Sequence, residues 1–217
     1  RKTKPRDPIS AKLVANLIAE AGADRVLTMD LHANQIQGFF DIPVDNLLGS
    51  PLFVSECFRK FAAVQDDTMV VSPDVGSVAR ARAFAQKLNM PLAIVDKRRQ
   101  KANSSEVMNI IGDVKDKHVI LLDDMVDTGG SLCHAAKALV DIGGAKDVTA
   151  VATHGLLSGP AVQRITDSVM DEVVFLDTIP PKPGMKCDKI RYISVAHMFA
   201  EAISHIYEET SVSRLFT

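Results

Sequence analysis

Short apolar runs alternate with amphipathic stretches along most of the chain. Residues 119–122 (Val-Ile-Leu-Leu) form one such run, and polar residues follow it, as is typical of a buried strand. Phe53, Phe58 and Phe61 recur at helical spacing within residues 51–63, which predicts a helix with an apolar stripe. The same reasoning predicts strands at 25–29, 68–72, 92–95, 118–122, 148–153, 172–176 and 190–194, and helices at 11–21, 51–63, 78–88, 131–142, 159–166 and 196–208.

This alternation predicts an α/β fold with a mostly parallel sheet flanked by helices on both faces. Ligands of such sheets bind outside the carboxyl ends of the strands, so we look for functional residues where each strand ends. Ser158 is the expected N-cap of the helix at 159–166, with Pro160 in its first turn.

The composition is that of an ordinary folded protein. Of 217 residues, 47% are hydrophobic and 24% charged, which excludes disordered, collagen-like and disulfide-scaffold classes. The net charge of −2 gives no reason to expect a nucleic-acid or membrane partner, and no apolar run reaches membrane-spanning length. Cys57, Cys133 and Cys187 are widely spaced, which favours reduced thiols in a cytoplasmic protein.

The segment 119–131 carries the most specific signal. Its strand is followed by adjacent carboxylates, Asp123 and Asp124, and then by residues 127–131 (Asp-Thr-Gly-Gly-Ser). Backbone N–H groups of a glycine-containing loop before a helix form an anion site, to which the two hydroxyl side chains add donors. The carboxylates repel a phosphate and suit sugar hydroxyls or a bridging metal. A capped strand–helix turn would explain the glycines alone, but the whole string favours phosphate binding.

Residues 96–103 (Asp-Lys-Arg-Arg-Gln-Lys-Ala-Asn) are dense in cations. A solvated basic loop is the usual explanation of such a run. This run, however, follows the predicted strand at 92–95, at the edge where the site is expected. Transfer of a phosphoryl or diphosphoryl group needs positive charge at the oxygens that gain charge, and this loop can supply it.

Two further strand ends carry acidic residues. Asp30 and His32 follow the strand at 25–29 two residues apart, so both can face one ligand and hold a divalent cation. Asp74 follows the strand at 68–72 in a glycine-containing turn and is a second candidate metal ligand. A structural His–Asp pair and a turn in which Asp caps a helix are the respective structural explanations.

The string at 119–131 resembles the phosphoribosyl-diphosphate-binding motif of the type I phosphoribosyltransferase fold. That motif alone leaves open both the phosphoribosyltransferases and the enzymes that make their common substrate. The four segments in order resemble one family, the ribose-phosphate diphosphokinases (phosphoribosyl diphosphate synthetases). The resemblance covers essentially the whole chain and rests on Asp-Leu-His-Ala-Asn-Gln-Ile-Gln-Gly-Phe-Phe-Asp-Ile-Pro at 30–43, Ser-Pro-Asp at 72–74, Lys97 and Arg99, the string at 123–131, Thr-His-Gly-Leu-Leu-Ser-Gly-Pro at 153–160 and Ser-Val-Ser-Arg-Leu-Phe at 211–216.

The resemblance implies transfer of the diphosphoryl group of ATP to the 1-hydroxyl of ribose 5-phosphate, giving 5-phosphoribosyl 1-diphosphate and AMP for nucleotide biosynthesis. It implies that Lys97 is the principal catalytic cation and that Arg99 assists it and also binds ribose 5-phosphate. Mg²⁺ is the implied cofactor, held by His32 and Asp74 with Asp30 nearby. The other implied ligands of ribose 5-phosphate are Asp123, Asp124, Asp127, Thr128, Gly129, Gly130 and Ser131.

The resemblance also implies a division of the chain. Residues 1–49 are expected to be the remnant of an N-terminal phosphoribosyltransferase-like domain, and 50–195 a C-terminal domain of the same kind. Residues 196–217 are expected to form a helix and tail that pack on the N-terminal domain. Family members carry another α/β segment before the position of Arg1 that holds adenine and ATP phosphates. This chain is therefore expected to bind ribose 5-phosphate more readily than it turns over ATP, and dimers assembling into a homohexamer are implied.

Two other functions compete with this interpretation. A base phosphoribosyltransferase would consume the same diphosphate, but the loop with Lys97 and Arg99 counts against it. A regulatory homologue would assemble with active synthetases without turning over substrate. Such subunits often lose the loop cations, and this loop retains them.

One residue departs from the family pattern. The family turn after the strand at 68–72 usually reads Ser-Pro-Asp-x-Gly-Gly, and Ser77 stands in place of the second glycine. If that position requires a positive φ, the turn is strained.

Overall fold

The computed structural model describes residues 6–98 and 107–216 of the chain. The chain divides into two compact units. Unit 1 combines the two ends of the chain, Arg1–Gly49 and Ala200–Thr217, and unit 2 is the continuous stretch Ser50–Phe199. The boundary near the C-terminus therefore falls inside a helix, four residues after the expected one at 195.

Unit 1 is built around a pair of parallel strands. Strand β1 (Val26–Met29) pairs with β2 (Val44–Leu47), so that Val26 lies opposite Val44 and Met29 opposite Leu47. The remaining elements are α1 (Ser10–Glu20), the 3₁₀ helix η1 (Asn34–Phe39), the part of α6 (Ala196–Tyr207) from residue 200, and the 3₁₀ helix η3 (Ser213–Phe216).

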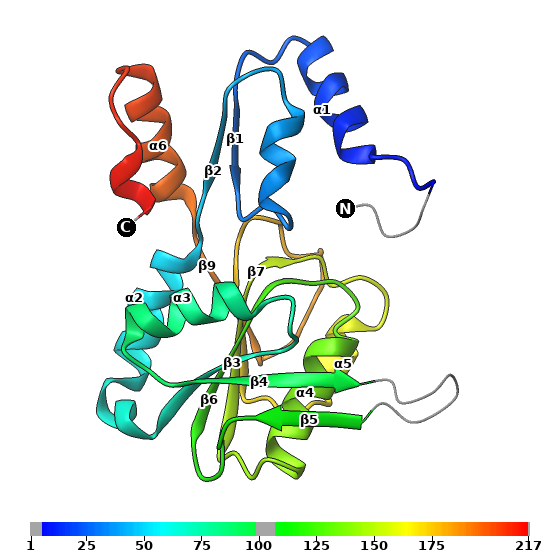
Figure 1. Ribbon diagram of the computed structural model, residues 1–217, viewed down its shortest axis with the longest axis vertical. Coiled ribbons are helices and arrows are strands. Elements are labelled where there is room, and N and C mark those ends of the chain that lie inside the picture. Colours follow the sequence, from blue (N-terminus) through cyan, green and yellow to red (C-terminus); the bar gives the residue numbers. More distant parts are fainter. Residues whose placement is uncertain (1–5, 99–106, 217) are drawn as a thin grey trace. The chain divides into compact units, whose positions relative to one another are not determined.

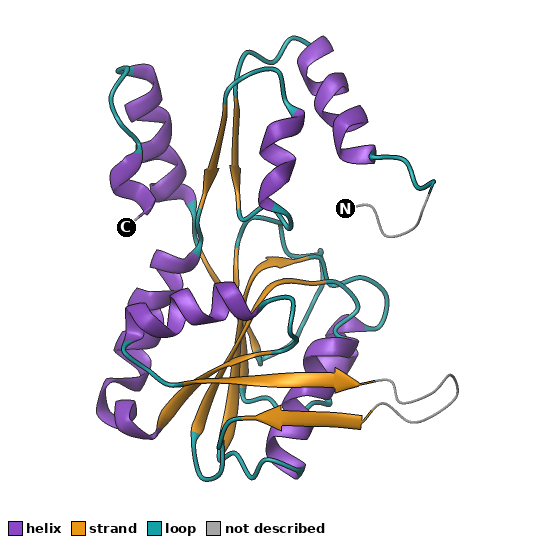
Figure 2. Cartoon of the chain, in the orientation of Figure 1, coloured by secondary structure: helices purple, strands orange, loops and turns teal. Residues whose placement is uncertain are grey.

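Unit 2 contains a seven-stranded sheet with the strand order β5-β4-β3-β6-β7-β8-β9. Every neighbouring pair is parallel except β4 and β5, which run antiparallel and lie beside each other in Figure 2. The predicted α/β fold with a mostly parallel sheet is confirmed. In chain order the elements are α2 (Ser50–Phe61), η2 (Ala62–Asp67), β3 (Thr68–Ser72), α3 (Val78–Leu88), β4 (Leu92–Arg98), β5 (Val107–Ile111), β6 (His118–Val126), α4 (Gly130–Asp141), β7 (Asp147–Gly155), α5 (Ala161–Thr166), β8 (Glu172–Leu176) and β9 (Ile190–Ile193).

Helices cover both faces of this sheet. In Figure 1, α2 and α3 lie on one side and α4 and α5 on the other. A hydrophobic core cluster joins Val119 and Leu121 of β6 to Leu132 and Leu139 of α4, all almost fully buried. Because side chains alternate along a strand, Ile120 between them faces the α2 and α3 side. Burial on both faces explains the continuous apolar run from which this strand was predicted.

Three details of the sequence prediction are wrong. Phe58 is 57% exposed and does not belong to the buried stripe of α2, which consists of Phe53, Cys57 and Phe61. The N-cap of α5 is Pro160 and not Ser158, and no side chain caps that helix. Strands β2 and β5 were not expected at all.

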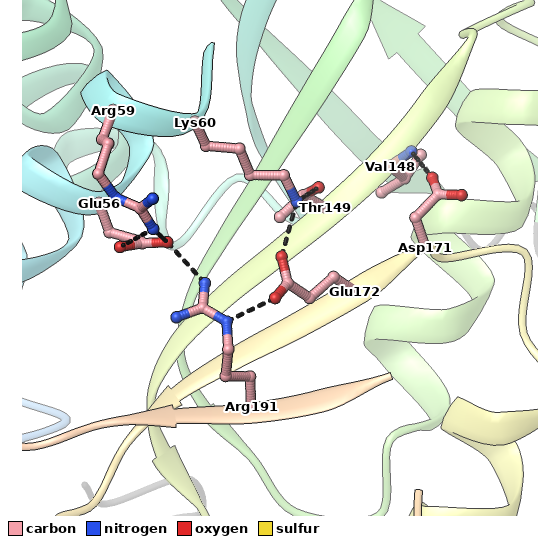
Figure 3. A network of polar contacts seen from close by, with 8 residues as sticks. All are labelled: Glu56, Arg59, Lys60, Val148, Thr149, Asp171, Glu172 and Arg191. Atoms are coloured by element: carbon pink, nitrogen blue, oxygen red, sulfur yellow. Dashed lines mark hydrogen bonds and ion pairs between the residues drawn. The ribbon is translucent and has the colours of Figure 1, made fainter. Parts of the chain in front are cut away.

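A network of alternating charges fastens α2 to the sheet (Figure 3). Arg191 of β9 donates to Glu172 of β8 at 2.6 Å and to Glu56 of α2 at 2.7 Å. Lys60 of α2 donates to the other oxygen of Glu172 at 2.6 Å and to the hydroxyl of Thr149 on β7 at 2.9 Å. The first helix of unit 2 is therefore bound to its last three strands.

Candidate active site

The carboxyl ends of adjacent strands bring three of the four predicted segments to one edge of the sheet. Strand β3 lies between β4 and β6 and is parallel to both. The turn with Asp74 follows β3, Lys97 lies near the end of β4, and the string at 123–131 spans the end of β6. Parallel strands end at the same edge, so these segments gather where ligands of open α/β sheets bind.

Strand β6 extends further than predicted, so Asp123 and Asp124 lie within it. Its pairing with β7 continues to Met125↔His154 and Val126↔Gly155. Successive residues of a strand point to opposite faces, so the two carboxylates have different surroundings. Asp124 is 6% exposed, and its Oδ1 lies 3.6 Å from Nη1 of Arg80 on α3. Asp123 is half-buried and its Oδ1 accepts a hydrogen bond from the Asp124 N–H at 2.8 Å.

The loop 127–130 has the geometry that an anion site needs. Gly129 is the N-cap of α4 with φ +73°, a left-handed conformation that glycine adopts without steric cost, and no side chain caps this helix. The N–H groups in the first turn of a helix lack acceptors within it, and the helix dipole places partial positive charge there. Asp127, Thr128 and Ser131 are exposed around this helix end. The start of α4 is therefore suited to a phosphate group.

Asp74 closes the turn between β3 and α3. Its Oδ1 accepts a hydrogen bond of 2.8 Å from the Ser77 N–H, and the Ser72 hydroxyl donates to its backbone carbonyl at 2.7 Å. Ser77 has φ −92°, so the residue that replaces the family's second glycine is unstrained. The carboxylate thus stabilises the turn before α3 but does not cap the helix, which has no side-chain cap, and in its exposed position it remains a candidate metal ligand.

Asp30 and His32 follow β1 in unit 1. Asp30 has φ +44°, and its Oδ2 accepts a hydrogen bond from the Gly49 N–H at 3.1 Å, which joins the ends of β1 and β2. His32 is exposed. No group of three or more His, Cys, Asp or Glu side chains able to hold a metal occurs within residues 6–98 and 107–216.

The cationic loop is only partly described. Strand β4 continues through the backbone of Lys97, which pairs with Met108 of β5. Arg99 lies outside the described residues.

Sequence reasoning missed Arg164, which contacts the backbone of the loop 127–130. Arg164 of α5 donates from Nη1 to the carbonyl oxygen of Thr128 at 2.9 Å. An isolated arginine on a short helix gives no pattern that points to a loop 36 residues earlier in the chain. The run at 153–160, which carried part of the family resemblance, ends just before α5. It was the one sequence motif near Arg164 that pointed to function.

Comparison with known proteins identifies the family. The model of the phosphoribosyl synthetase-associated domain matches residues 100–217. The ribose-phosphate pyrophosphokinase of Clostridium perfringens is 60% identical over 216 residues, which are all of this chain and 67% of that protein. That of Caldanaerobacter subterraneus is 61% identical over 217 residues, 68% of its length.

The chain belongs to the ribose-phosphate pyrophosphokinase family. The family is one of enzymes, transferases of nucleotide biosynthesis, and the chain spans about two thirds of the length of these relatives. The crystal structure of phosphoribosylpyrophosphate synthetase from Mycobacterium smegmatis has a TM-score of 0.88 and 41% identity, covering 96% of this chain and 67% of that one. The resemblance inferred from the motifs is thereby confirmed. Within the described part of the chain, no helix has the length and apolar character to cross a membrane.

Proposed function

We propose that the chain contributes to the transfer of the diphosphoryl group of ATP to the 1-hydroxyl of ribose 5-phosphate, giving 5-phosphoribosyl 1-diphosphate and AMP. The observation that carries this proposal is the glycine-capped start of α4 at the carboxyl edge of the sheet, next to the carboxylates of β6. A sugar phosphate fits this arrangement, because its phosphate occupies the helix end while its hydroxyls approach Asp123. Membership of the family supplies the reaction class.

The reaction asks little covalent chemistry of the protein. The attacking oxygen is that of the sugar's 1-hydroxyl, which releases its proton to solvent as the new bond forms to the β-phosphorus of ATP, and AMP leaves with the bridging oxygen. Binding both substrates in line and neutralising the oxygens that gain charge are the tasks left to side chains. We assign the first task to Asp123, Asp124 and residues 127–131, and the second to Lys97 and Arg99.

Mg²⁺ is the proposed cofactor, with His32 and Asp74 as ligands and Asp30 nearby. Mg²⁺ prefers oxygen ligands and is usually held by one or two carboxylates together with substrate phosphates and water. Asp30 and Asp74 are carboxylates, the ligand type that Mg²⁺ prefers, and each accepts a hydrogen bond from a backbone N–H, that of Gly49 and that of Ser77 respectively. When bound, the ion neutralises phosphate charge.

We also propose a domain division and an oligomeric state for the protein. That Arg1–Gly49 and Ala200–Thr217 form one compact unit supports the proposal that residues 1–49 and the last helix and tail share an N-terminal domain. By the family resemblance we propose a cytoplasmic homo-oligomer of dimers assembled into a hexamer. Light scattering on the purified protein gives the assembly directly.

Two measurements test the function. Calorimetric titration of the chain with ribose 5-phosphate should show binding that ribose alone does not match, because ribose lacks the phosphate that α4 receives. A protein with the relatives' full length should form AMP from ATP and ribose 5-phosphate only with Mg²⁺. Formation of a nucleoside monophosphate from a base and phosphoribosyl diphosphate would instead show a phosphoribosyltransferase, and binding without turnover at full length a regulatory homologue.

A further inference from the structure

Three consecutive carbonyl groups, that of Val126 at the end of β6 and those of Asp127 and Thr128 in the loop 127–130, accept hydrogen bonds from residues 157–164. The carbonyl oxygen of Val126 accepts from the Leu157 N–H at 3.1 Å, and that of Asp127 accepts from the Ser158 N–H at 2.9 Å. The third, that of Thr128, accepts from the side chain of Arg164 at 2.9 Å. Leu157 itself has φ +51° and its carbonyl oxygen accepts from Lys182 at 2.7 Å, so the holding segment is fixed in turn.

Helix α5 fits closely against the loop and against α4, beside which it lies in Figure 1. A Cβ added at Gly129 would lie 3.5 Å from the Cα and the carbonyl oxygen of Ala161, in the first turn of α5. A Cβ added at Gly130 would lie 3.4 Å from Nη1 of Arg164. The Cys133 thiol donates to the Arg164 carbonyl oxygen at 3.6 Å. The guanidinium group therefore lies at the first residue of α4, where the anion site begins.

Of these three contacts, the one from Arg164 alone brings a full charge. A guanidinium group stays protonated at every physiological pH. The oxygen of Thr128 carries partial negative charge, which opposes an anion at the adjacent helix end, and the hydrogen bond from Arg164 offsets it. Arg164 is exposed, so its guanidinium group keeps access to solvent beside the loop.

We propose that Arg164 is a positioning residue for the phosphate of ribose 5-phosphate. It fixes the Thr128 carbonyl and adds positive charge behind the loop, without itself belonging to the loop motif. The proposal rests on the proposed function, because that function places the phosphate at the start of α4.

The test compares Arg164→Met and Arg164→Lys with the unchanged chain by calorimetric titration with ribose 5-phosphate. Loss of a charged hydrogen bond is expected to weaken binding about tenfold in Arg164→Met. Arg164→Lys keeps the charge and should recover part of the affinity. Salt screens the attraction between a cation and the phosphate. Because Arg164→Met removes one such cation, its affinity for ribose 5-phosphate should fall less between 50 and 200 mM salt than the affinity of the unchanged chain. A purely structural role would not change that dependence.

Lys137→Met is the matched control. Lys137 lies on α4, is exposed, and pairs with Asp141 at the other end of the helix, so this substitution removes the same charge away from the loop. Affinity of Arg164→Met equal to that of Lys137→Met overturns the inference. Thermal unfolding identifies a variant that fails to fold, in which case the Arg164→Lys affinity decides. Failure of the unchanged chain to bind ribose 5-phosphate contradicts the proposed function itself and is a different result.

Discussion

Arg191 Nη2 lies 2.7 Å from Glu56 Oε1, although 135 residues separate them in the chain. The same guanidinium group donates to Glu172, so one arginine joins α2, β8 and β9. Helix α2 is the first element after the junction at Gly49, and β9 is the last strand before α6. Within unit 2, one arginine therefore joins the first helix of the unit to its last strand.

Replacing Arg191 should destabilise unit 2. In Arg191→Met, Glu56 and Glu172 lose their shared cation while 16% and 22% exposed, so their charges stay poorly solvated. We expect a loss of about 2 kcal/mol in the free energy of unfolding. Urea denaturation followed by circular dichroism measures it. Arg59→Met is the control, since Arg59 pairs with Glu56 while 75% exposed, and it should change stability by less than about 0.5 kcal/mol. Equal effects of the two substitutions would contradict the prediction.

The Glu172 carboxylate should make stability depend on acid pH. Burial alone would raise the pKa of Glu172, but hydrogen bonds from Arg191 and Lys60 outweigh it and lower the pKa below the ordinary 4.5. A lowered folded-state pKa contributes stability that is complete above the unfolded value and is lost as pH falls through the folded value. The difference in unfolding free energy between the unchanged chain and Glu172→Gln should therefore be constant from pH 7 to about 5.5 and shrink below about 4.5. A difference that stays constant into acid would refute this assignment.

Gly129→Ala should impair binding of ribose 5-phosphate. Its φ of +73° strains any L-residue, and the new Cβ would contact the backbone of Ala161. We expect a loss of about 1–2 kcal/mol in stability, together with weaker binding, because the positive φ strains an alanine at the start of α4. Gly144→Ala is the matched control, since Gly144 has φ +71° in the exposed turn after α4. It should lose similar stability and bind ribose 5-phosphate normally in the same titration.

Lys97→Ala should abolish nearly all formation of AMP in a protein with the relatives' full length. The substitution removes the cation that we assign to the oxygens gaining charge, and such contacts contribute about 10²–10³-fold or more to turnover. The rate is measured by AMP release, and the melting temperature shows whether the fold is retained. Lys137→Ala serves as the control for loss of an exposed lysine. An unchanged rate in Lys97→Ala would remove the loop from the mechanism.

Cys57 should resist alkylation in the folded chain. Burial is the main reason that the pKa of its thiol is raised to about 12, and the neighbouring Glu56 adds to the effect. At pH 8 the thiol is therefore protonated as well as covered, and iodoacetamide reacts with thiolates. Mass spectrometry of peptides should show Cys57 labelled only after unfolding in urea. Rapid labelling of the native chain would mean that α2 opens readily from the sheet.

The interior strands could be predicted because burial on both faces leaves a continuous apolar run. Strands β3 and β8 have the predicted bounds, 68–72 and 172–176. Strand β5 escaped prediction because it lies at the sheet edge, next to a cationic segment and partly exposed, so its pattern resembles a loop. Strand β6 is longer than predicted, because a polar residue such as Asp124 suggests in the sequence that a buried strand has ended. In the structure Asp124 is buried within the strand, and Arg80 lies close enough to offset the charge of its carboxylate.

The candidate site, too, could be predicted only in part from the sequence. Its loop could be recognised because glycines, hydroxyls and carboxylates of one short segment share one task. The contribution of Arg164 could not, because it depends on how α5 lies against that loop, which no local pattern encodes. All the assigned roles stay predictions, those of Asp123, Asp124 and residues 127–131 as well as those of Lys97, Arg99, His32, Asp30 and Asp74.

Unit 1 is assembled from the first and the last parts of the chain, with the whole of unit 2 between them. On the ribosome, residues 1–49 emerge before unit 2 but meet their partner segment only after residue 200 has been made. Unit 2 can complete its sheet during that interval, whereas β1 and β2 wait for α6 and the tail. The part of unit 1 that is made before unit 2 is thus completed only after it, and until then it stays open to chaperones and proteases.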